Sequence, residues 1–168
     1  MSQKNKIQII AEQGKQECYI IREFDAPREM VFEAFSDPEL FVQFWGPDRV
    51  TTNLDHYDFR TGGAYRYTNS DEKGKELCAF SGVIHEVTAP ERIIQTSEFE
   101  GLPERGHVVL ETLLFESLPG NRTKLTFHEV CRSVADRDAM VMSGMETGLD
   151  EGFKRLDKLL QGNLKQTL

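Results

Sequence analysis

The stretch 134–161 constrains the fold of this chain more than any other feature. Its apolar residues recur at steps of three and four, at Met142, Met145, Leu149, Phe153, Leu156 and Leu160. Such spacing places a single apolar stripe along one side of an α-helix. A continuous helix over this stretch would be about 40 Å long. A stripe of that length must be buried, so the residues before it have to form its partner.

Sequence signals mark both ends of this expected helix. Ser133, three residues before Asp136, resembles a capping box that satisfies the first backbone N–H groups. Gly162 occupies the position of a residue that ends a helix in the left-handed conformation. We therefore predict one helix over 134–161, with its start at the Ser133 cap and its end before Gly162.

Three glycines lie inside the expected helix. Gly144, Gly148 and Gly152 recur at intervals of four and share a face beside the apolar stripe. Each interior helical glycine costs about 1 kcal/mol relative to alanine, so three in register need a structural reason. Close packing against a neighbouring element is one explanation, and the wall of a cavity is the other. Both stay open at the level of sequence.

The residues before 134 are mostly predicted strands. These runs are rich in β-branched and aromatic residues and are bounded by turn residues. Two short apolar helices, at 27–35 and 38–45, each begin with a proline. Because no helix interrupts the later strands, we expect antiparallel neighbours in chain order. The predicted fold class is α+β, a curved antiparallel sheet wrapped around a long C-terminal helix, with the two short helices closing one end. The predicted strands are 17–24, 50–59, 65–69, 77–87, 92–99, 107–116 and 123–131.

Composition narrows the classes of partner. By length we expect one domain over 1–168, with 1–14 as an extra N-terminal strand or tail. The formal net charge of −8, without any basic run, argues against nucleic acid and anionic membranes. We find no signal peptide and no segment that would insert in a membrane. Cys18, Cys78 and Cys131 lie far apart, outside any CxxC spacing, so we expect reduced thiols and a cytoplasmic protein.

Four stretches of this sequence resemble one family, and together they cover most of the chain. They are FDAPREMVFEAFSDPELFVQFWGP (24–47), DFRTGGAYRY (58–67), FSGVIHEVTAPERI (80–93) and SGMETGLDEGFKRLDKLL (143–160). The family is that of the activator of 90-kDa heat-shock protein ATPase homologues, in the START-like, birch-allergen-like (SRPBCC) superfamily. The resemblance implies a helix-grip fold with an apolar cavity between sheet and helix. We do not expect a chaperone partner, because true co-chaperones carry a separate chaperone-binding domain before this one.

The candidate ligand-binding residues are apolar, aromatic or small. Trp45 follows a short amphipathic helix, and Tyr65 and Tyr67 share a strand face and offer hydroxyl groups. For each candidate, packing in a solid core is the alternative interpretation. The full set is Phe41, Trp45, Tyr65, Tyr67, Leu113, Phe115, Phe127, Met145, Gly148 and Leu149.

The last predicted hairpin brings two acids together. A short loop centred on Gly120 pairs Phe115 with Leu125 and places Glu111 opposite Glu129. Both carboxylates would then point inward, where burial and like charge raise the pKa of at least one. We take these two as candidate catalytic residues. The alternative is an ordinary ionised pair at a wet barrel mouth.

No other catalytic or cofactor signature is present in the sequence. The four histidines are dispersed, and His107 and Glu111 are about 13 Å apart along a strand, too far to share one metal. We therefore expect no metal and no cofactor. The leading hypothesis is a binder of a small apolar or amphipathic molecule in an internal cavity. A cofactor-independent enzyme that uses Glu111 and Glu129 is the first alternative, and a chaperone-interacting stress-response protein is the second. A homodimer stays open.

Overall fold

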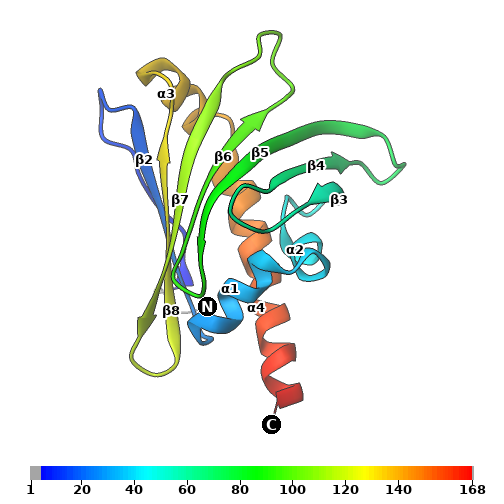
Figure 1. The fold of residues 1–168 in the computed structure, drawn as a ribbon, viewed down its shortest axis with the longest axis vertical. Helices are drawn as coiled ribbons and strands as arrows, with labels where there is room; N and C mark the ends of the chain where they lie inside the picture. Colours follow the sequence, from blue (N-terminus) through cyan, green and yellow to red (C-terminus); the bar gives the residue numbers. More distant parts are fainter. Residues whose placement is uncertain (1–4, 168) are drawn as a thin grey trace.

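The computed structural model describes the backbone of residues 5–167 and the side chains of residues 5–163. Within these residues, eight strands form one antiparallel sheet in the order β1-β2-β8-β7-β6-β5-β4-β3. The sheet curves around the last helix, which confirms the predicted fold class (Figure 1). Residues 1–4 of the predicted N-terminal segment lie outside the described residues. The strands are β1 Gln8–Ile10, β2 Glu17–Phe24, β3 Thr51–Tyr57, β4 Ala64–Ser70, β5 Glu76–Thr88, β6 Arg92–Phe99, β7 Val108–Leu118 and β8 Arg122–Val130.

Strict alternation of side chains builds the concave face of the sheet. Along β8 the buried residues are every second one, from Thr123 to Glu129, and the residues between them are half-buried. The strand β2 alternates in the same way and pairs with β8 over its whole length. The concave side that these residues line is therefore buried and mostly apolar, and it needs a long apolar partner.

Two short helices, α1 (Arg28–Ser36) and α2 (Pro38–Phe44), close one end of the sheet as predicted. Asp37 caps α2 by accepting a hydrogen bond from the Glu39 backbone N–H at 2.8 Å, and Pro38 takes the first helical position. The Phe35 ring packs edge-on against Phe115 of β7, with ring centroids 5.6 Å apart. The plug is therefore an aromatic cluster shared by the two helices and the sheet.

The predicted continuous helix over 134–161 is wrong. The structure contains two helices, α3 (Val134–Met142) and α4 (Met145–Thr167), and α4 continues past Gly162. Ser133 caps α3 as predicted, accepting from the Asp136 N–H at 3.0 Å. The break occurs because Gly144 adopts a φ of +88°, a left-handed conformation that ends a helix. Met142, which was expected in the buried stripe, is 85% exposed as a consequence.

The glycines serve close packing at one position and chain reversal at another. A Cβ on Gly152 would lie 2.8 Å from the carbonyl oxygen of Phe44, so α4 approaches the end of α2 backbone to backbone. A Cβ on Gly148 would meet only the Pro47 ring, at ordinary contact distance of 3.7 Å. Gly148 and Gly152 therefore lie on the side of α4 that is turned toward the end of α2 and the loop after it. Gly144 precedes α4 and is not part of that side.

An apolar seat and one buried ion pair hold α4 on the sheet. Phe153, Leu156 and Leu160 are almost fully buried in the main core cluster. Arg22 points inward from β2, and its guanidinium donates to both carboxylate oxygens of Asp157, at 2.7 and 2.6 Å. Arg22 is 1% exposed, so this pair is shielded from solvent on its cationic side. Although α4 is long, no helix in the described part of the chain is apolar enough to cross a membrane.

We predict that Asp157→Ala lowers the free energy of unfolding by about 3–5 kcal/mol, because it leaves the buried Arg22 charge without its partner. The measurement is urea unfolding followed by circular dichroism. Asp150→Ala is the matched control on the same helix, since it removes an exposed pair with Lys154 and should change stability little. Equal losses in the two variants would contradict the anchoring role of Arg22.

Candidate functional site

Four polar side chains form a single row across the concave face of the sheet. Gln95 lies opposite Glu111, Glu111 opposite Glu129, and Glu129 opposite Cys18, so the row crosses β6, β7, β8 and β2 without a gap. We call these four residues the polar row. The neighbouring row toward the β7–β8 turn is entirely apolar and buried. It consists of Ile93, Leu113, Phe127 and Ile20.

The register that places the two acids together was predicted from the turn and is confirmed by the structure. Glu111 and Glu129 are directly opposite one another and are 9% and 6% exposed. Burial raises the pKa of Glu111 to about 7, while Ser97, Glu129 and Gln95 offset part of the rise by hydrogen bonding. Burial also raises the pKa of Glu129 well above its usual range, and the nearby Glu111 carboxylate adds to the rise. The two acids therefore hold a proton between them near neutral pH.

The thiols beside the acids are poor nucleophiles. Burial, and next the charge of Glu129, raises the pKa of Cys18 to about 12 and that of Cys131 to about 11. A cysteine is reactive as its thiolate, which these two do not form at neutral pH. The chemistry available to the polar row is therefore hydrogen bonding and proton exchange by carboxyl groups.

Two contacts farther along α4 lead us to infer that Leu149 lies near the level of Glu129. The strand β8 and the helix α4 run in opposite directions (Figure 1). Arg22, which is opposite Leu125, binds Asp157, and the Phe127 ring contacts Phe153 at 6.1 Å. Two strand residues span about 6.7 Å and one helical turn about 5.4 Å, so the next level pairs Glu129 with Leu149.

Burial decreases along α4 toward this level. Phe153 and Leu156 are 1% and 0% exposed, whereas Leu149 and Met145 are only half-buried against the core. On the sheet, Val109 and Ser97 are likewise half-buried, and Phe99 is 38% exposed at the end of β6. The concave face is therefore closed on the side of the polar row toward the β7–β8 turn. It is partly open on the opposite side, toward α3.

The predicted ligand-binding residues fall into two groups. Six of them are buried in the core cluster, namely Phe41, Tyr65, Tyr67, Leu113, Phe115 and Phe127. The hydroxyl of Tyr65 donates to the Thr96 carbonyl at 2.6 Å, and the hydroxyl of Tyr67 accepts from the Trp45 indole N–H at 2.8 Å. Trp45, Met145, Gly148 and Leu149 are half-buried instead. Of these, Met145 and Leu149 lie toward the open side of the polar row, and Gly148 lies against Pro47.

Gln95, Ser97 and Phe99 belong to this site and were missed from the sequence. All three are on β6, whose side-chain alternation predicts that they share one face. Their level relative to Glu111 depends on the β6–β7 register, and the long loop between these strands leaves that register undetermined. The register itself, Gln95 with Glu111 and Ser97 with Val109, comes from the structure.

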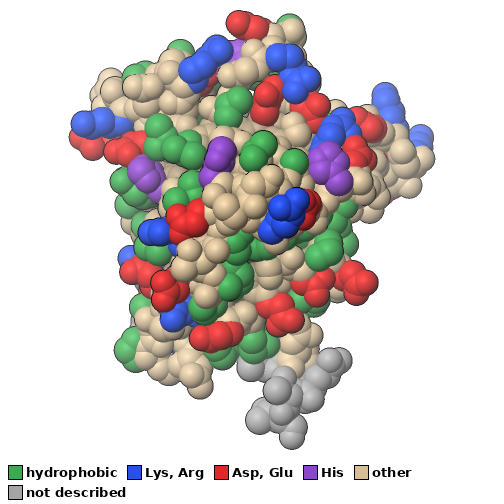
Figure 2. Space-filling model, viewed as in Figure 1, with side chains coloured by type: hydrophobic (Ala, Val, Ile, Leu, Met, Phe, Trp, Pro, Cys, Tyr) green, Lys and Arg blue, Asp and Glu red, His purple; other side chains and the backbone are tan. Residues whose placement is uncertain are grey.

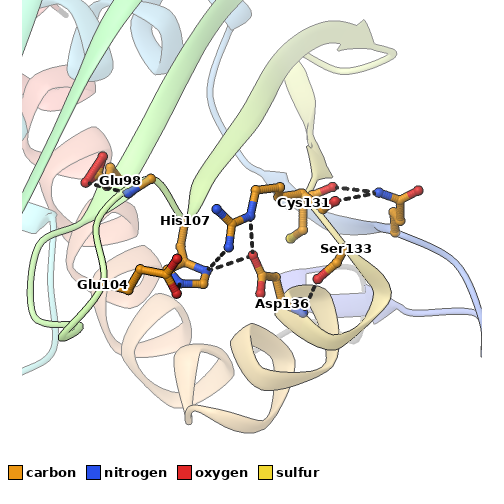
Figure 3. A network of polar contacts seen from close by, with 9 residues as sticks. Glu98, Glu104, His107, Cys131, Ser133 and Asp136 are labelled. Atoms are coloured by element: carbon orange, nitrogen blue, oxygen red, sulfur yellow. Dashed lines mark hydrogen bonds and ion pairs between the residues drawn. The ribbon is translucent and has the colours of Figure 1, made fainter.

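A charged network lies at the open end of β7 and β8. His107 Nδ1 donates to Asp136 of α3 at 2.9 Å, and its Nε2 lies 3.5 Å from Glu104 in the β6–β7 loop (Figure 3). The hydrogen bond from His107 is the main cause that holds the pKa of Asp136 below its usual range. Among the described residues, no three His, Cys, Asp or Glu side chains are grouped so as to hold a metal ion.

A hollow lies on the outer side of the sheet. It encloses about 320 Å³ and is bordered by Ala64, Gly82 and Val83 together with Arg66 and Glu98. Acidic and basic side chains are interspersed with apolar ones on the face shown in Figure 2. The guanidinium of Arg66 is already paired with Asp55 and Glu100, so this hollow offers no free charge at that side chain.

We predict that replacing both Glu111 and Glu129 by Gln stabilises the protein at neutral pH. The folded-state pKa of Glu111 is about 7, above the unfolded value of about 4.3, so the wild-type protein loses stability as pH rises between these values. The gain at pH 8 should be at least about 4 kcal/mol, which is the part that the raised pKa of Glu111 alone implies, and should vanish at pH 4. Urea unfolding at several pH values measures it.

The matched control is Glu116→Gln, because Glu116 lies on the same strand β7 and is exposed. It should leave the pH dependence of stability unchanged. If NMR showed that both Glu111 and Glu129 of the wild-type protein titrate near pH 4, this result would contradict the buried shared proton.

Comparison with known proteins identifies the family and confirms the fold. Residues 25–161 match the family described as "Activator of Hsp90 ATPase homolog 1-like protein". A crystal structure from Rhodobacter sphaeroides is 22% identical, with a TM-score of 0.83, over 94% of this chain and 99% of that one. A solution structure from Arthrobacter aurescens is 23% identical, with a TM-score of 0.80, over 92% and 91%.

A third similar structure is titled as an AHSA1 protein, from Silicibacter pomeroyi. It is 22% identical, with a TM-score of 0.70, over 88% of this chain and 99% of that one. At these identities the three structures support the fold alone. No curated protein matches the sequence. Because the family match covers most of its residues, the chain belongs to the family of Activator of Hsp90 ATPase homolog 1-like proteins.

Proposed function

We propose that this protein binds a small amphipathic molecule on the concave face, with the polar end of the ligand at the polar row. The observation that carries the proposal is the change in burial along α4. Phe153 and Leu156 are sealed against the sheet, while Leu149, inferred to lie near the level of the two buried carboxyl groups, and Met145, one turn beyond it, remain half-buried. A half-buried apolar wall facing convergent polar groups is the usual make-up of a small-molecule site.

The chemistry of the row favours a ligand that carries a hydroxyl or amine. The two carboxyl groups share a proton near neutral pH, so they offer one donor and several acceptor positions. Gln95 adds a carboxamide at one end of the row, and Ser97 adds a hydroxyl beside it. No cation is among the groups that act on the pair, and an anionic ligand would therefore meet like charge.

The fold and the cysteines are consistent with this proposal. The family belongs to a superfamily whose helix-grip fold leaves space between sheet and helix, and the chain has that fold. The three cysteines are free thiols in the structure. Free thiols suit a reducing compartment such as the cytoplasm, which is where we place the protein.

Native mass spectrometry of freshly purified protein is the first test, because it shows whether a small molecule accompanies the chain. In parallel, the neutral dye Nile red should bind at about one per chain. Leu149→Trp should weaken this binding at least tenfold, since it fills the space beside Glu129. Met142→Trp is the matched control, because it adds the same bulk at an 85% exposed position. Equal effects of the two variants would contradict the proposed location.

The class of ligand is tested by three compounds of equal chain length. At pH 8, decylamine should displace Nile red best, decanol less well, and decanoate worst, because the carboxyl pair then carries negative charge. We expect the amine to bind at least tenfold more tightly than the carboxylate, about 1.4 kcal/mol. The preference should shrink at pH 5, where both acids are protonated. An unchanged order at pH 5 and pH 8 would show that the pair does not face the ligand.

Acid–base catalysis at the same pair is the second candidate function. The specific observation in its favour is the pKa of Glu111, which at about 7 suits a group that exchanges protons at neutral pH. In this case Glu111 would accept a proton from the bound molecule and Glu129 would return one. Turnover of the molecule found by mass spectrometry, lost in both Glu111→Gln and Glu129→Gln, would establish an enzyme. Binding that persists without turnover would leave the protein a binder.

A further inference from the structure

The strands that carry the two acids separate just beyond them. The β7–β8 ladder ends at the pair Leu110 and Val130, one position after Glu111 and Glu129. From there β7 continues to Val108 with β6 as its only paired neighbour, and the chain after β8 turns away into α3. The backbone bonds that join β7 to β8 are therefore missing at the open end of the polar row.

A side-chain contact bridges this gap. His107 immediately precedes β7, and Asp136 lies in the first turn of α3. The imidazole Nδ1 donates to the Asp136 carboxylate at 2.9 Å (Figure 3). Arg132 reinforces the junction, because its guanidinium lies 3.6 Å from the same carboxylate. The bridge thus replaces the absent ladder bonds beside the half-buried wall of the site.

The other hydrogen bonds that hold α3 come from a guanidinium and a carboxamide, which are groups that keep their charge near neutral pH. The Arg137 guanidinium donates to the carbonyl oxygens of Glu12 and Glu17, at 2.9 and 3.0 Å. The Gln16 carboxamide donates to the carbonyl oxygens of Cys131 and Arg132. These bonds tie α3 to the β1–β2 side of the sheet. Among the described residues, the hydrogen bonds and ion pairs from this junction toward β7 pass through His107.

We propose that His107 is a pH-sensitive latch, which fastens α3 to β7 over the open end of the polar row and tightens as the imidazole gains a proton. Imidazole is the side chain that ordinarily changes charge between pH 5 and 8. Protonation places a full positive charge on the ring, turns the hydrogen bond to the Asp136 carboxylate into an ion pair, and gives Nε2 a proton that faces Glu104, 3.5 Å away. The attraction between the ring and these two carboxylates is therefore stronger for the cationic imidazole.

The charges around His107 favour this direction. Carboxylates face it from three elements, namely Asp136 of α3, Glu104 of the β6–β7 loop and Glu98 of β6, whose pKa is lowered in part by His107. Two cations oppose them. Arg132 lies 3.3 Å from Nδ1, and Arg105 is engaged with the Glu98 carboxylate at 2.5 Å. The three carboxylates outnumber the two guanidinium groups around the ring, so a cationic imidazole is surrounded by a net negative charge.

Control of ligand exchange by the latch rests on the proposed function. When the latch is closed, α3 and the β6–β7 loop are held together at the end of the concave face toward which burial along α4 decreases, from Leu149 to Met145. When His107 is neutral, the two segments separate more readily. Ligand entry and exit should therefore be slower at acidic pH.

The latch itself is tested without any ligand, by hydrogen exchange with mass spectrometry on peptides that cover residues 100–108 and 132–142. Exchange times at pH 6 and pH 8 are scaled by the intrinsic chemical rates. In the wild-type protein, both peptides should be about threefold or more better protected at pH 6. His107→Gln should abolish this difference. Persistence of the difference in His107→Gln, or its absence in the wild-type protein, would overturn the latch.

Two control variants separate the latch from other titrating groups. The double variant Glu111→Gln with Glu129→Gln should keep the pH-dependent protection, and so should His56→Gln, at an exposed histidine on β3. Loss of the effect in the double variant would assign it to the carboxyl pair and overturn the proposal.

Stopped-flow binding of Nile red then tests the gating. Association should be about threefold slower at pH 6 than at pH 8, and this ratio should fall to one in His107→Gln. A pH-independent rate in a protein whose exchange shows the latch would overturn the gating. If Nile red fails to bind at any pH, the proposed function fails at that site, while the exchange experiment still decides the latch.

Discussion

The position of α4 on the sheet is the constraint on which the rest of the structure depends. Apolar burial alone is non-directional, and a helix stripe could shift by one turn along a groove with little loss. The bidentate pair between Arg22 and Asp157 removes that freedom, because a guanidinium and a carboxylate match at one level only. Gly152 adds a second restraint, since backbone contact with Phe44 is possible only where no Cβ intervenes. Together they hold α4 at one level along the sheet, and we infer from that level that Leu149 lies near Glu129.

The two acids of the polar row differ from the other buried charged groups that the structure describes, because they are not paired with a side chain of opposite charge. Arg22 has Asp157 as a buried partner, and Arg137 has Asp138 together with two carbonyl oxygens. Among the described residues, neither Glu111 nor Glu129 forms an ion pair with a cation, so a shared proton is what reduces their charge. Keeping the pKa of Glu111 near 7 costs about 3 kcal/mol at neutral pH. That is a large fraction of the 5–15 kcal/mol by which a domain is stable. Buried acids that are kept without a cation at such a cost in stability are expected at functional positions.

Local patterns were enough to predict the part of the site that a short turn controls. The β7–β8 loop is brief, so its length determined the register and correctly placed Glu111 opposite Glu129. The same reasoning could not reach Gln95 and Ser97, because the loop between β6 and β7 is long. The alternation in β2 places Arg22 inward, but its partner Asp157 is 135 residues away and invisible to periodicity.

The break between α3 and α4 shows a different limit of sequence patterns. Met142 and Met145 are three residues apart, so their spacing continues the helical stripe across Ser143 and Gly144 and does not reveal the break. The backbone conformation of Gly144, with φ of +88°, leaves no mark on that spacing. The consequence is functional as well as geometric. Because the chain turns at this glycine, α3 becomes a separate element, and its attachment to β7 depends on side chains.

The carboxyl pair and the proposed latch would act in the same direction on a bound neutral amphiphile. As pH rises through neutrality, the carboxyl pair gains negative charge in a nearly dry setting, which disfavours an apolar neighbour. In the proposed latch, a neutral His107 holds the Asp136 carboxylate more weakly than a cationic one does. Retention is therefore strongest where both are protonated. A cationic ligand would reverse the first effect and leave the second unchanged, so the charge of the ligand decides whether binding strength and exchange rate rise together.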